Sequence, residues 1–239
     1  MVRYSANGNS FVIFNLLTKP MNDYEKERLV LENVGDDDGA LFVEKKDELF
    51  AMDYFNRDGK RAKFCGNGSR AFLKYLFDEG YINEGRIKFW SYAGVLEGIV
   101  KRDKVSVAMP DASSIEKVYF DSCEGYLITV GVPHFVVRRE NVEKIDVEKV
   151  GKYLRDLSNA NVDFFEEISR GFLRIRTYER GVERETKACG SGATATFIVY
   201  RKETKVTEAT FYTLGGPLRL YLSEGKIFLE GSVERCSEG

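Results

Sequence analysis

Two cysteines of this chain begin nearly the same short sequence. Cys65 opens the segment C-G-N-G-S, and Cys189 opens the segment C-G-S-G-A. Each segment leads into a run that predicts a helix, so each thiol is expected beside a helix N-terminus, where unpaired amide groups and the positive end of the helix dipole lie. That position favours the thiolate, which can act as a base near neutral pH.

The glycines of these turns give the backbone a second role. With no side chains in the way, the backbones of Gly66 and Asn67, and of Gly190 and Ser191, can hold a carboxylate. Two such sites facing one another would bind one amino-acid carboxylate and flank its α-carbon with two thiols. One thiolate would remove the α-proton while the opposite thiol protonates the other face, which inverts the stereocentre. A racemase or epimerase of this kind needs no pyridoxal cofactor.

For any single cysteine, the bland alternative is an inert buried thiol. The chain has four cysteines, at positions 65, 123, 189 and 236, and none forms a C-x-x-C pair. With only one histidine, His134, a structural zinc site is not expected. The symmetric placement favours chemistry for Cys65 and Cys189 alone, with Cys123 and Cys236 dispensable.

The two cysteine segments belong to a duplicated unit. Three segments of the first half recur in the same order in the second half, at nearly the same offset. They are G-N-S-F-V at 8–12 with V-P-H-F-V at 132–136, the two cysteine turns, and F-W-S-Y-A-G-V-L at 89–96 with F-Y-T-L-G-G-P-L at 211–218. We therefore predict two half-domains, 1–114 and 115–239, and leave open that the last strand, about 232–239, joins the first half.

Short strands dominate both halves. Runs rich in Val, Ile, Phe and Tyr, bounded by Gly, Asn or Asp, predict strands at 11–17, 40–43, 86–91, 95–100, 105–109, 126–130, 134–137, 172–178, 209–212, 218–222 and 226–230. Helical spacing predicts helices at 69–78, 193–202 and 147–157, the last with Val147, Val150, Leu154 and Leu157 on one face. The fold class expected is α/β in the broad sense (α+β). It has two pseudo-symmetric half-domains, each a strongly curved, mostly antiparallel sheet wrapped around a central helix, with the active site in the cleft between them.

The sequence resembles the diaminopimelate epimerase family along nearly its whole length. The motifs that carry the resemblance are A-N-G-N-S-F-V at 6–12, N-R-D-G at 56–59, F-C-G-N-G-S-R at 64–70, G-V-P-H at 131–134, N-V-D-F at 161–164, Y-E-R-G at 178–181, E-T-K-A-C-G-S-G at 185–192 and G-G-P-L at 215–218. The two cysteine motifs together are highly specific.

This resemblance implies conversion of LL-diaminopimelate to the meso form, for lysine and peptidoglycan synthesis, with no cofactor and no metal. It implies proton transfer by Cys65 and Cys189, with His134 and Glu179 near the thiols, keeping one ionised and one protonated. The backbones at Gly66, Asn67, Gly190 and Ser191 would hold the reacting carboxylate, and the distal end of the substrate would be bound by Asn9, Asn56, Asn161 and Arg180.

One departure from the family pattern concerns the substrate. Val132 stands where the family has an asparagine before Pro-His, which removes an amide contact and leads us to hypothesise relaxed recognition of the distal end. Two rival functions stay open: a broader amino-acid racemase of the same fold, such as the proline or hydroxyproline racemases, and a non-catalytic two-lobed amino-acid-binding protein. The phenazine-pathway isomerases lack the cysteine pair, so both thiols argue against them.

Composition narrows the range of partners. The net charge of -2 and the pI near 5.7 argue against a nucleic-acid or membrane-surface binder. No apolar run is long enough to cross a bilayer, and the first residues lack the apolar region of a secretory signal. We expect a cytoplasmic protein whose partner is a small amino acid, with a homodimer left open.

Overall fold

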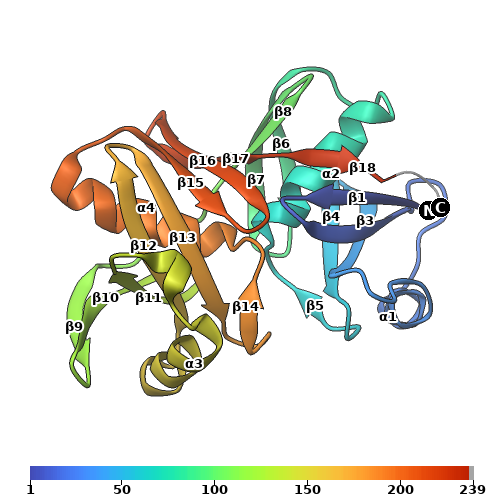
Figure 1. Cartoon of the computed structure of the whole chain (residues 1–239). Coiled ribbons are helices and arrows are strands. Elements are labelled where there is room, and N and C mark those ends of the chain that lie inside the picture. Colours follow the sequence, from blue (N-terminus) through green and yellow to red (C-terminus); the bar gives the residue numbers. More distant parts are fainter. Residues whose placement is uncertain (237–239) are drawn as a thin grey trace. The chain divides into compact units, whose positions relative to one another are not determined.

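The computed structural model of the chain describes residues 1–236 (Figure 1). They form two compact units, one made of Met1–Ala108 with the segment from Glu230 onward, and the other of Met109–Leu229. Each unit combines a mixed sheet with two α-helices, so the α+β class predicted from the sequence is confirmed. None of the helices within residues 1–236 has both the length and the apolar character needed to cross a membrane.

The first unit contains two crossover helices. Its strands are β1 (Val2–Ala6), β2 (Asn9–Asn15), β3 (Gly39–Lys46), β4 (Leu49–Asn56), β5 (Arg61–Ala62), β6 (Gly85–Ser91), β7 (Gly94–Lys101), β8 (Lys104–Ala108) and β18 (Val233–Arg235), and its helices are α1 (Asp23–Asn33) and α2 (Gly66–Asp78). Helix α1 links the parallel strands β2 and β3, and α2 links the parallel strands β4 and β6. Strand β18 pairs with β1; residues 237–239 of the predicted last strand lie outside the described residues.

The second unit repeats this plan. Its elements are β9 (Glu116–Phe120), β10 (Cys123–Val130), β11 (Val132–Arg138), the 3-10 turn η1 (Val142–Lys144), α3 (Val147–Ser158), β12 (Asn161–Ser169), β13 (Phe172–Glu179), β14 (Arg184–Thr186), α4 (Gly190–Thr204), β15 (Glu208–Thr213), β16 (Gly216–Ser223) and β17 (Lys226–Gly231), whose last residues belong to the first unit. Helix α3 links the parallel strands β11 and β12, and α4 links the parallel strands β13 and β15. The order of connections therefore matches the first unit.

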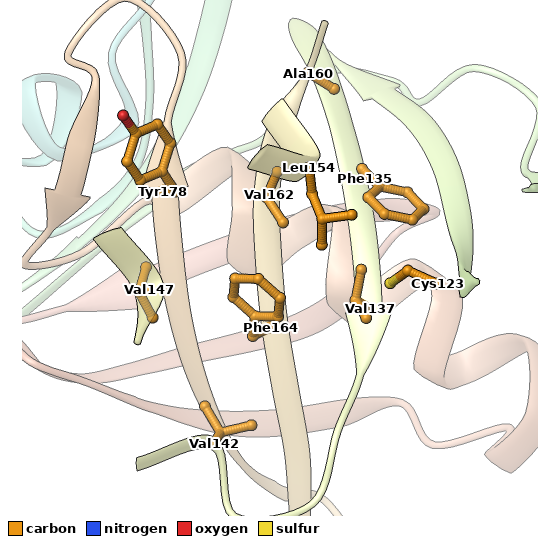
Figure 2. Close-up of a cluster of buried hydrophobic side chains, with 10 residues drawn as sticks. All are labelled: Cys123, Phe135, Val137, Val142, Val147, Leu154, Ala160, Val162, Phe164 and Tyr178. Carbon is orange, nitrogen blue, oxygen red and sulfur yellow. The ribbon is translucent and has the colours of Figure 1, made fainter. Parts of the chain in front are cut away.

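In the second unit, the strand pleat separates the apolar core from the polar site. Phe135 on β11 and Phe164 on β12 belong to a buried cluster that includes Leu154 of α3 (Figure 2). Because neighbouring residues on a strand point to opposite faces, His134 and Asp163 point away from this cluster. They face α4, since a methyl group added at Gly192 would overlap the carboxylate of Asp163.

The first unit uses the same alternation. Val12 and Phe14 on β2 pack with Val30 of α1 in a buried cluster. The residues that alternate with them on β2, such as Phe11, point to the opposite face of the sheet, where α2 lies. The pleat thus places Asn9, at the start of β2, on the face that carries α2.

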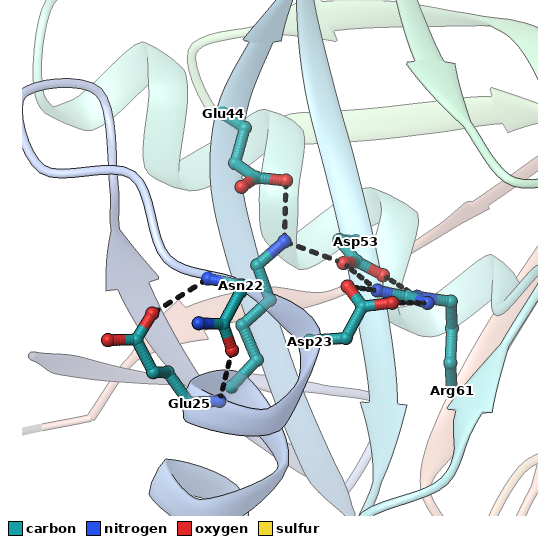
Figure 3. Close-up of polar contacts among 7 residues, drawn as sticks. Asn22, Asp23, Glu25, Glu44, Asp53 and Arg61 are labelled. Carbon is teal, nitrogen blue, oxygen red and sulfur yellow. Dashed lines mark hydrogen bonds and ion pairs between the residues drawn. The ribbon is translucent and has the colours of Figure 1, made fainter.

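Helix α1 was missed by sequence analysis because its inner face is not apolar. Among its residues only Lys26 and Val30 are buried. The Lys26 ammonium lies 2.8 Å from Glu44 and 2.9 Å from Asp53 (Figure 3), so an ion pair takes the place of apolar packing. The start of the helix is a capping box between Asn22 and Glu25, a local signal that the sequence does contain.

Other elements differ from expectation in detail. Every predicted strand is present, the last one as the short β18, whereas β1, β4, β9, β12 and the short β5 and β14 were not predicted. Helix α3 was placed correctly, and Val147 and Leu154 of its predicted apolar face are buried, whereas Val150 and Leu157 are 39% and 45% exposed. The buried face also includes Gly151, where an added methyl group would collide with Tyr178.

Candidate active site

Cys65 is the N-cap residue of α2. Its backbone is extended, and its sulfur accepts a hydrogen bond from the backbone N–H of Gly68, with a sulfur–nitrogen distance of 3.3 Å. A methyl group at Gly68 would come within 3.4 Å of that sulfur, so glycine keeps this approach open. The first turn of α2 thus presents amide donors to the thiol, an arrangement that favours its ionised form.

Polar side chains beside Cys65 form a short relay. Asn67, in the first turn of α2, donates its amide to the side-chain oxygen of Asn9 at 2.7 Å. Its own side-chain oxygen accepts a hydrogen bond from the guanidinium of Arg70, which is completely buried. Two predicted substrate-binding residues, Asn9 of β2 and Asn67 of α2, are therefore brought together at the start of α2.

Asn56 lies apart from that relay. It is the last residue of β4, and its backbone closes a turn with Gly59 and Lys60. Register with β3 places it opposite Gly39, on the same face as Tyr54. Within residues 1–236 its exposed side chain makes no hydrogen bond, so the structure does not join it to Asn9 or Asn67.

Cys189 occupies the corresponding position in the second unit, as the N-cap of α4. Unlike Cys65, it is buried, with 8% of its surface exposed, and its sulfur lies 3.5 Å from the hydroxyl of Ser191. Burial, followed by the carboxylates of Glu179 and Asp163, raises the pKa of the Cys189 thiol well above its ordinary value. The Ser191 hydroxyl and the Gly192 amide act in the opposite direction but do not prevail. The surroundings of Cys189 therefore favour the protonated thiol.

His134 is held in a buried polar cluster. Its Nδ1 atom lies 2.7 Å from a carboxylate oxygen of Asp163, and neither side chain is exposed. The other oxygen of Asp163 accepts a hydrogen bond from the Thr177 hydroxyl at 2.7 Å. Since Asp163 abuts Gly192 in the first turn of α4, the cluster lies against the start of the Cys189 helix.

Asn161 connects His134 to the end of β13. Its amide nitrogen lies 3.4 Å from His134 Nε2, and its side-chain oxygen accepts a hydrogen bond from the backbone N–H of Arg180 at 2.7 Å. The Arg180 guanidinium donates to the backbone oxygen of Asn159 at 2.9 Å. Glu179, the last residue of β13, is half-buried and acts on Cys189 through its charge. Hydrogen bonds thus link His134, Asn161 and Arg180, and Glu179, the neighbour of Arg180 in the chain, acts on the N-cap thiol of α4.

Sequence reasoning overlooked two buried charged residues, Arg70 and Asp163. Both lie inside motifs that had been recognised, but at positions to which no role was given. A usable signal was present: Asp163 interrupts the apolar run N-V-D-F-F, and Arg70 precedes Ala-Phe-Leu in a helix. Charged residues at such positions are buried only when they are paired or hydrogen-bonded.

Known proteins that match this chain belong to the family that the cysteine motifs resemble. The sequence model of diaminopimelate epimerase matches residues 1–115 and 126–235. A diaminopimelate epimerase from Thermotoga maritima is 50% identical over 235 residues, covering 98% of this chain and 99% of that protein. One from Aquifex aeolicus is 33% identical over 268 residues, covering 99% and 95%.

Solved structures of lower sequence identity share the fold. A phenazine biosynthesis protein of the PhzF family from Enterococcus faecalis aligns with a TM-score of 0.80 at 20% identity, covering 99% of this chain and 96% of that chain. A hydroxyproline epimerase from Agrobacterium vitis aligns with a TM-score of 0.74 at 15% identity, covering 99% and 90%. Because the family match spans nearly the whole chain and both cysteine motifs, the chain belongs to the diaminopimelate epimerase family.

Proposed function

We propose that this protein interconverts LL- and meso-diaminopimelate, with Cys65 and Cys189 as the two proton carriers. The observation that carries the proposal is the repeated placement of a cysteine at the N-cap of a crossover helix, once in each unit. Identity of 50% to a relative named diaminopimelate epimerase supports the choice of substrate. The two rival functions are not favoured, because the relatives are epimerases of this substrate.

In the proposed reaction, the two cysteines act on opposite faces of one substrate α-carbon. The thiolate of one cysteine takes the α-proton, and the electron pair left on the α-carbon spreads into the adjoining carboxylate. The thiol of the other cysteine then gives its proton to the opposite face of that carbon. Each turnover leaves the two sulfurs with exchanged protonation states, so no external acid, base or cofactor is consumed.

The helix starts would bind the reacting carboxylate. The first amides of a helix have no acceptor within the helix, and the positive end of its dipole favours a negative ligand. Gly66 and Asn67 provide these amides in α2, and Gly190 and Ser191 provide them in α4. The same groups would stabilise charge that develops on the carboxylate as the proton leaves.

The distal end of the substrate carries a second ammonium and a second carboxylate. We assign its recognition to Asn9, Asn56, Asn161 and Arg180, because amides both donate and accept hydrogen bonds and a guanidinium binds a carboxylate through paired donors. Arg180 is half-buried and held at one end by Asn159, which leaves it oriented before substrate arrives. A cytoplasmic location is part of the proposal, as expected for an enzyme of amino-acid synthesis.

Selectivity is the finer part of the proposal. Val132 begins β11, two residues before His134, and is 41% exposed. A valine there offers no hydrogen bond to the distal end, so we propose that lysine and ornithine are turned over as well as diaminopimelate. A very large preference for LL-diaminopimelate over both would end this part of the proposal while leaving the reaction type intact.

Incubation in deuterated water tests the proposal. The protein should introduce deuterium at the α-carbon of LL-diaminopimelate and produce the meso isomer, whereas a binding protein would leave the hydrogen in place. Cys65→Ala and Cys189→Ala should each abolish epimerisation. The matched controls are Cys123→Ala and Cys236→Ala, because Cys123 lies in the apolar cluster of Figure 2 and neither residue is the N-cap of α2 or α4. Substantial activity in both Cys65→Ala and Cys189→Ala would refute the assignment.

A further inference from the structure

Arg70 is a buried cation that the proposed reaction does not yet use. It lies on α2, five residues after Cys65, and none of its surface is exposed. One terminal nitrogen donates to the side-chain oxygen of Asn7 at 2.8 Å, and the other donates to that of Asn67. Among residues 1–236 its Nε atom has no hydrogen-bond partner, and no carboxylate lies within ion-pair distance of its guanidinium. A buried charge with only neutral partners is costly to a fold.

The backbone around Arg70 is shaped to hold it. A methyl group at Gly231 would overlap both the guanidinium and the Asn7 oxygen, so glycine at the end of β17 leaves room for this contact. Asn7 itself adopts the left-handed conformation, with φ of 48°, which brings its side chain to Arg70. A glycine, a left-handed asparagine and a helix residue thus come together from three segments around one guanidinium.

The charge of Arg70 persists at neutral pH and interacts with Cys65. Burial lowers the pKa of Arg70 to about 10, against the opposing influence of Cys65 and Glu230, so the guanidinium stays positive at pH 7. The attraction between a guanidinium and a thiolate is mutual, so Arg70 favours the ionised form of Cys65 as well. The hydrogen bond from the Gly68 amide to the Cys65 sulfur acts in the same sense.

Other charges on the strands packed against α2 are already paired. The pairs are Glu230 with Lys104, Glu97 with Arg86, and Asp53 with both Lys26 and Arg61. On α2 itself, Lys74 pairs with Asp78 one turn later. Their fields at Cys65 are therefore partly cancelled, whereas Arg70 feels Glu230 only from beyond ion-pair distance and has no paired carboxylate within residues 1–236.

We propose that Arg70 is a positioning residue that stabilises the thiolate of Cys65, which makes Cys65 the ionised cysteine of the resting enzyme. The inference rests on the proposed function, in which Cys65 is one of two proton carriers. The second unit provides the contrast, because Cys189 is buried near Glu179 and Asp163 and is favoured as the thiol. Arg70 also holds Asn67, and through it Asn9, so one guanidinium organises both the base and its polar neighbours.

The test is the pH dependence of alkylation at Cys65, measured on the intact protein with iodoacetamide and resolved by peptide mass spectrometry. In Arg70→Met, removal of the cation should slow alkylation of Cys65 at pH 7 by about tenfold or more and move its pH midpoint upward. Arg70→Lys keeps a positive charge and should retain most of the rate. The Cys189 peptide in the same samples is the internal control, and its pH midpoint should not move.

A second variant keeps the test decisive if Arg70→Met does not fold. Asn7→Asp has nearly the same shape and places a carboxylate against the guanidinium, so it should also raise the pH midpoint of Cys65. The proposal is overturned if neither Arg70→Met nor Asn7→Asp changes the pH midpoint of Cys65. If Arg70→Met is unfolded, an unchanged midpoint in Asn7→Asp is enough to overturn it. A purely structural role for Arg70 would lower the melting temperature without moving the midpoint.

Deuterium exchange separates this inference from the proposed function. If Cys65 shows the expected pH profile but the protein exchanges no α-hydrogen, the proposed function fails and the electrostatic role of Arg70 stands. If exchange proceeds normally and the Cys65 midpoint ignores both variants, the role of Arg70 fails and the proposed function stands.

Discussion

Replacing Asp163 with asparagine tests how the second unit controls the protonation of Cys189. Asp163 is completely buried and accepts two hydrogen bonds, one from Thr177 and one at His134 Nδ1, both at 2.7 Å. Asparagine offers a single acceptor oxygen, so one of the two donors loses its partner. An unsatisfied buried donor costs about 1–3 kcal/mol, which lowers the melting temperature of a chain of this size by several degrees.

Asp163→Asn should also change Cys189. Asp163 is one of two carboxylates that raise the pKa of that thiol, after burial, so removal of its charge should lower the pKa. Alkylation of Cys189 should then be faster at a given pH near neutrality, although Glu179 and burial keep the pKa above its ordinary value. The variant is therefore expected to be less stable and more reactive at Cys189.

Thr177→Val is the matched control. It removes the same hydrogen bond to Asp163 but keeps the carboxylate charge, so stability should fall while the pH profile of Cys189 stays in place. The assay combines thermal unfolding with site-resolved alkylation between pH 6 and 10, a range chosen to span roughly the ordinary thiol pKa. An unchanged or upward-shifted profile in Asp163→Asn would refute the electrostatic reasoning, whatever happens to stability.

The remaining predictions concern stability, pH and substrate. Asp53→Ala should cost about 3–5 kcal/mol in urea unfolding, because it leaves buried Lys26 and its neighbour Arg61 without their shared carboxylate (Figure 3); a loss below about 1 kcal/mol would show that the ion network is replaceable. Burial and the hydrogen bond to Asp78 raise the pKa of Tyr4 above 10, so its contribution to stability is fully present below pH 10 and is lost as the pH rises above 10. Tyr4→Phe should therefore flatten the alkaline limb of a stability profile, and an unaltered limb would contradict this. Val132→Asn should increase turnover of LL-diaminopimelate relative to L-lysine, since it restores an amide at an exposed position; an unchanged ratio would remove position 132 from substrate selection.

Most of the architecture was accessible from the sequence where local signals were strong. Helices α2 and α4 were predicted in both copies from the runs after the Gly-rich segments, although each helix begins at the first glycine of its segment, before the predicted start. Helix α1 was missed because its buried face holds Lys26 instead of a second apolar residue. A lysine can be predicted as buried only when the carboxylates that pair with it, on other strands, are known. Val150 was expected on the buried face of α3 but is exposed. The neighbouring Gly151 contacts Tyr178 instead, and a residue without a side chain gives no apolar signal in the sequence.

In the candidate site, too, some residues could be predicted from the sequence and others could not. The cysteines, His134 and the asparagines could be found because their residue types and motifs indicate chemistry. Arg70 and Asp163 could not, because their importance lies in burial and in partners far away in sequence, such as Asn7 for Arg70. The opposite electrostatic surroundings of the two cysteines likewise follow from tertiary contacts, since the two sequence segments are nearly identical.

The central claim is that Cys65 and Cys189 serve a single stereocentre. It is tested most directly by a short bifunctional thiol reagent applied to the native protein, with cross-linked peptides identified by mass spectrometry. The account predicts a Cys65–Cys189 cross-link that forms in preference to any link involving Cys123 or Cys236, and that saturating meso-diaminopimelate blocks. Efficient single labelling of both cysteines with no cross-link between them, or a cross-link that forms equally well with substrate bound, would contradict it.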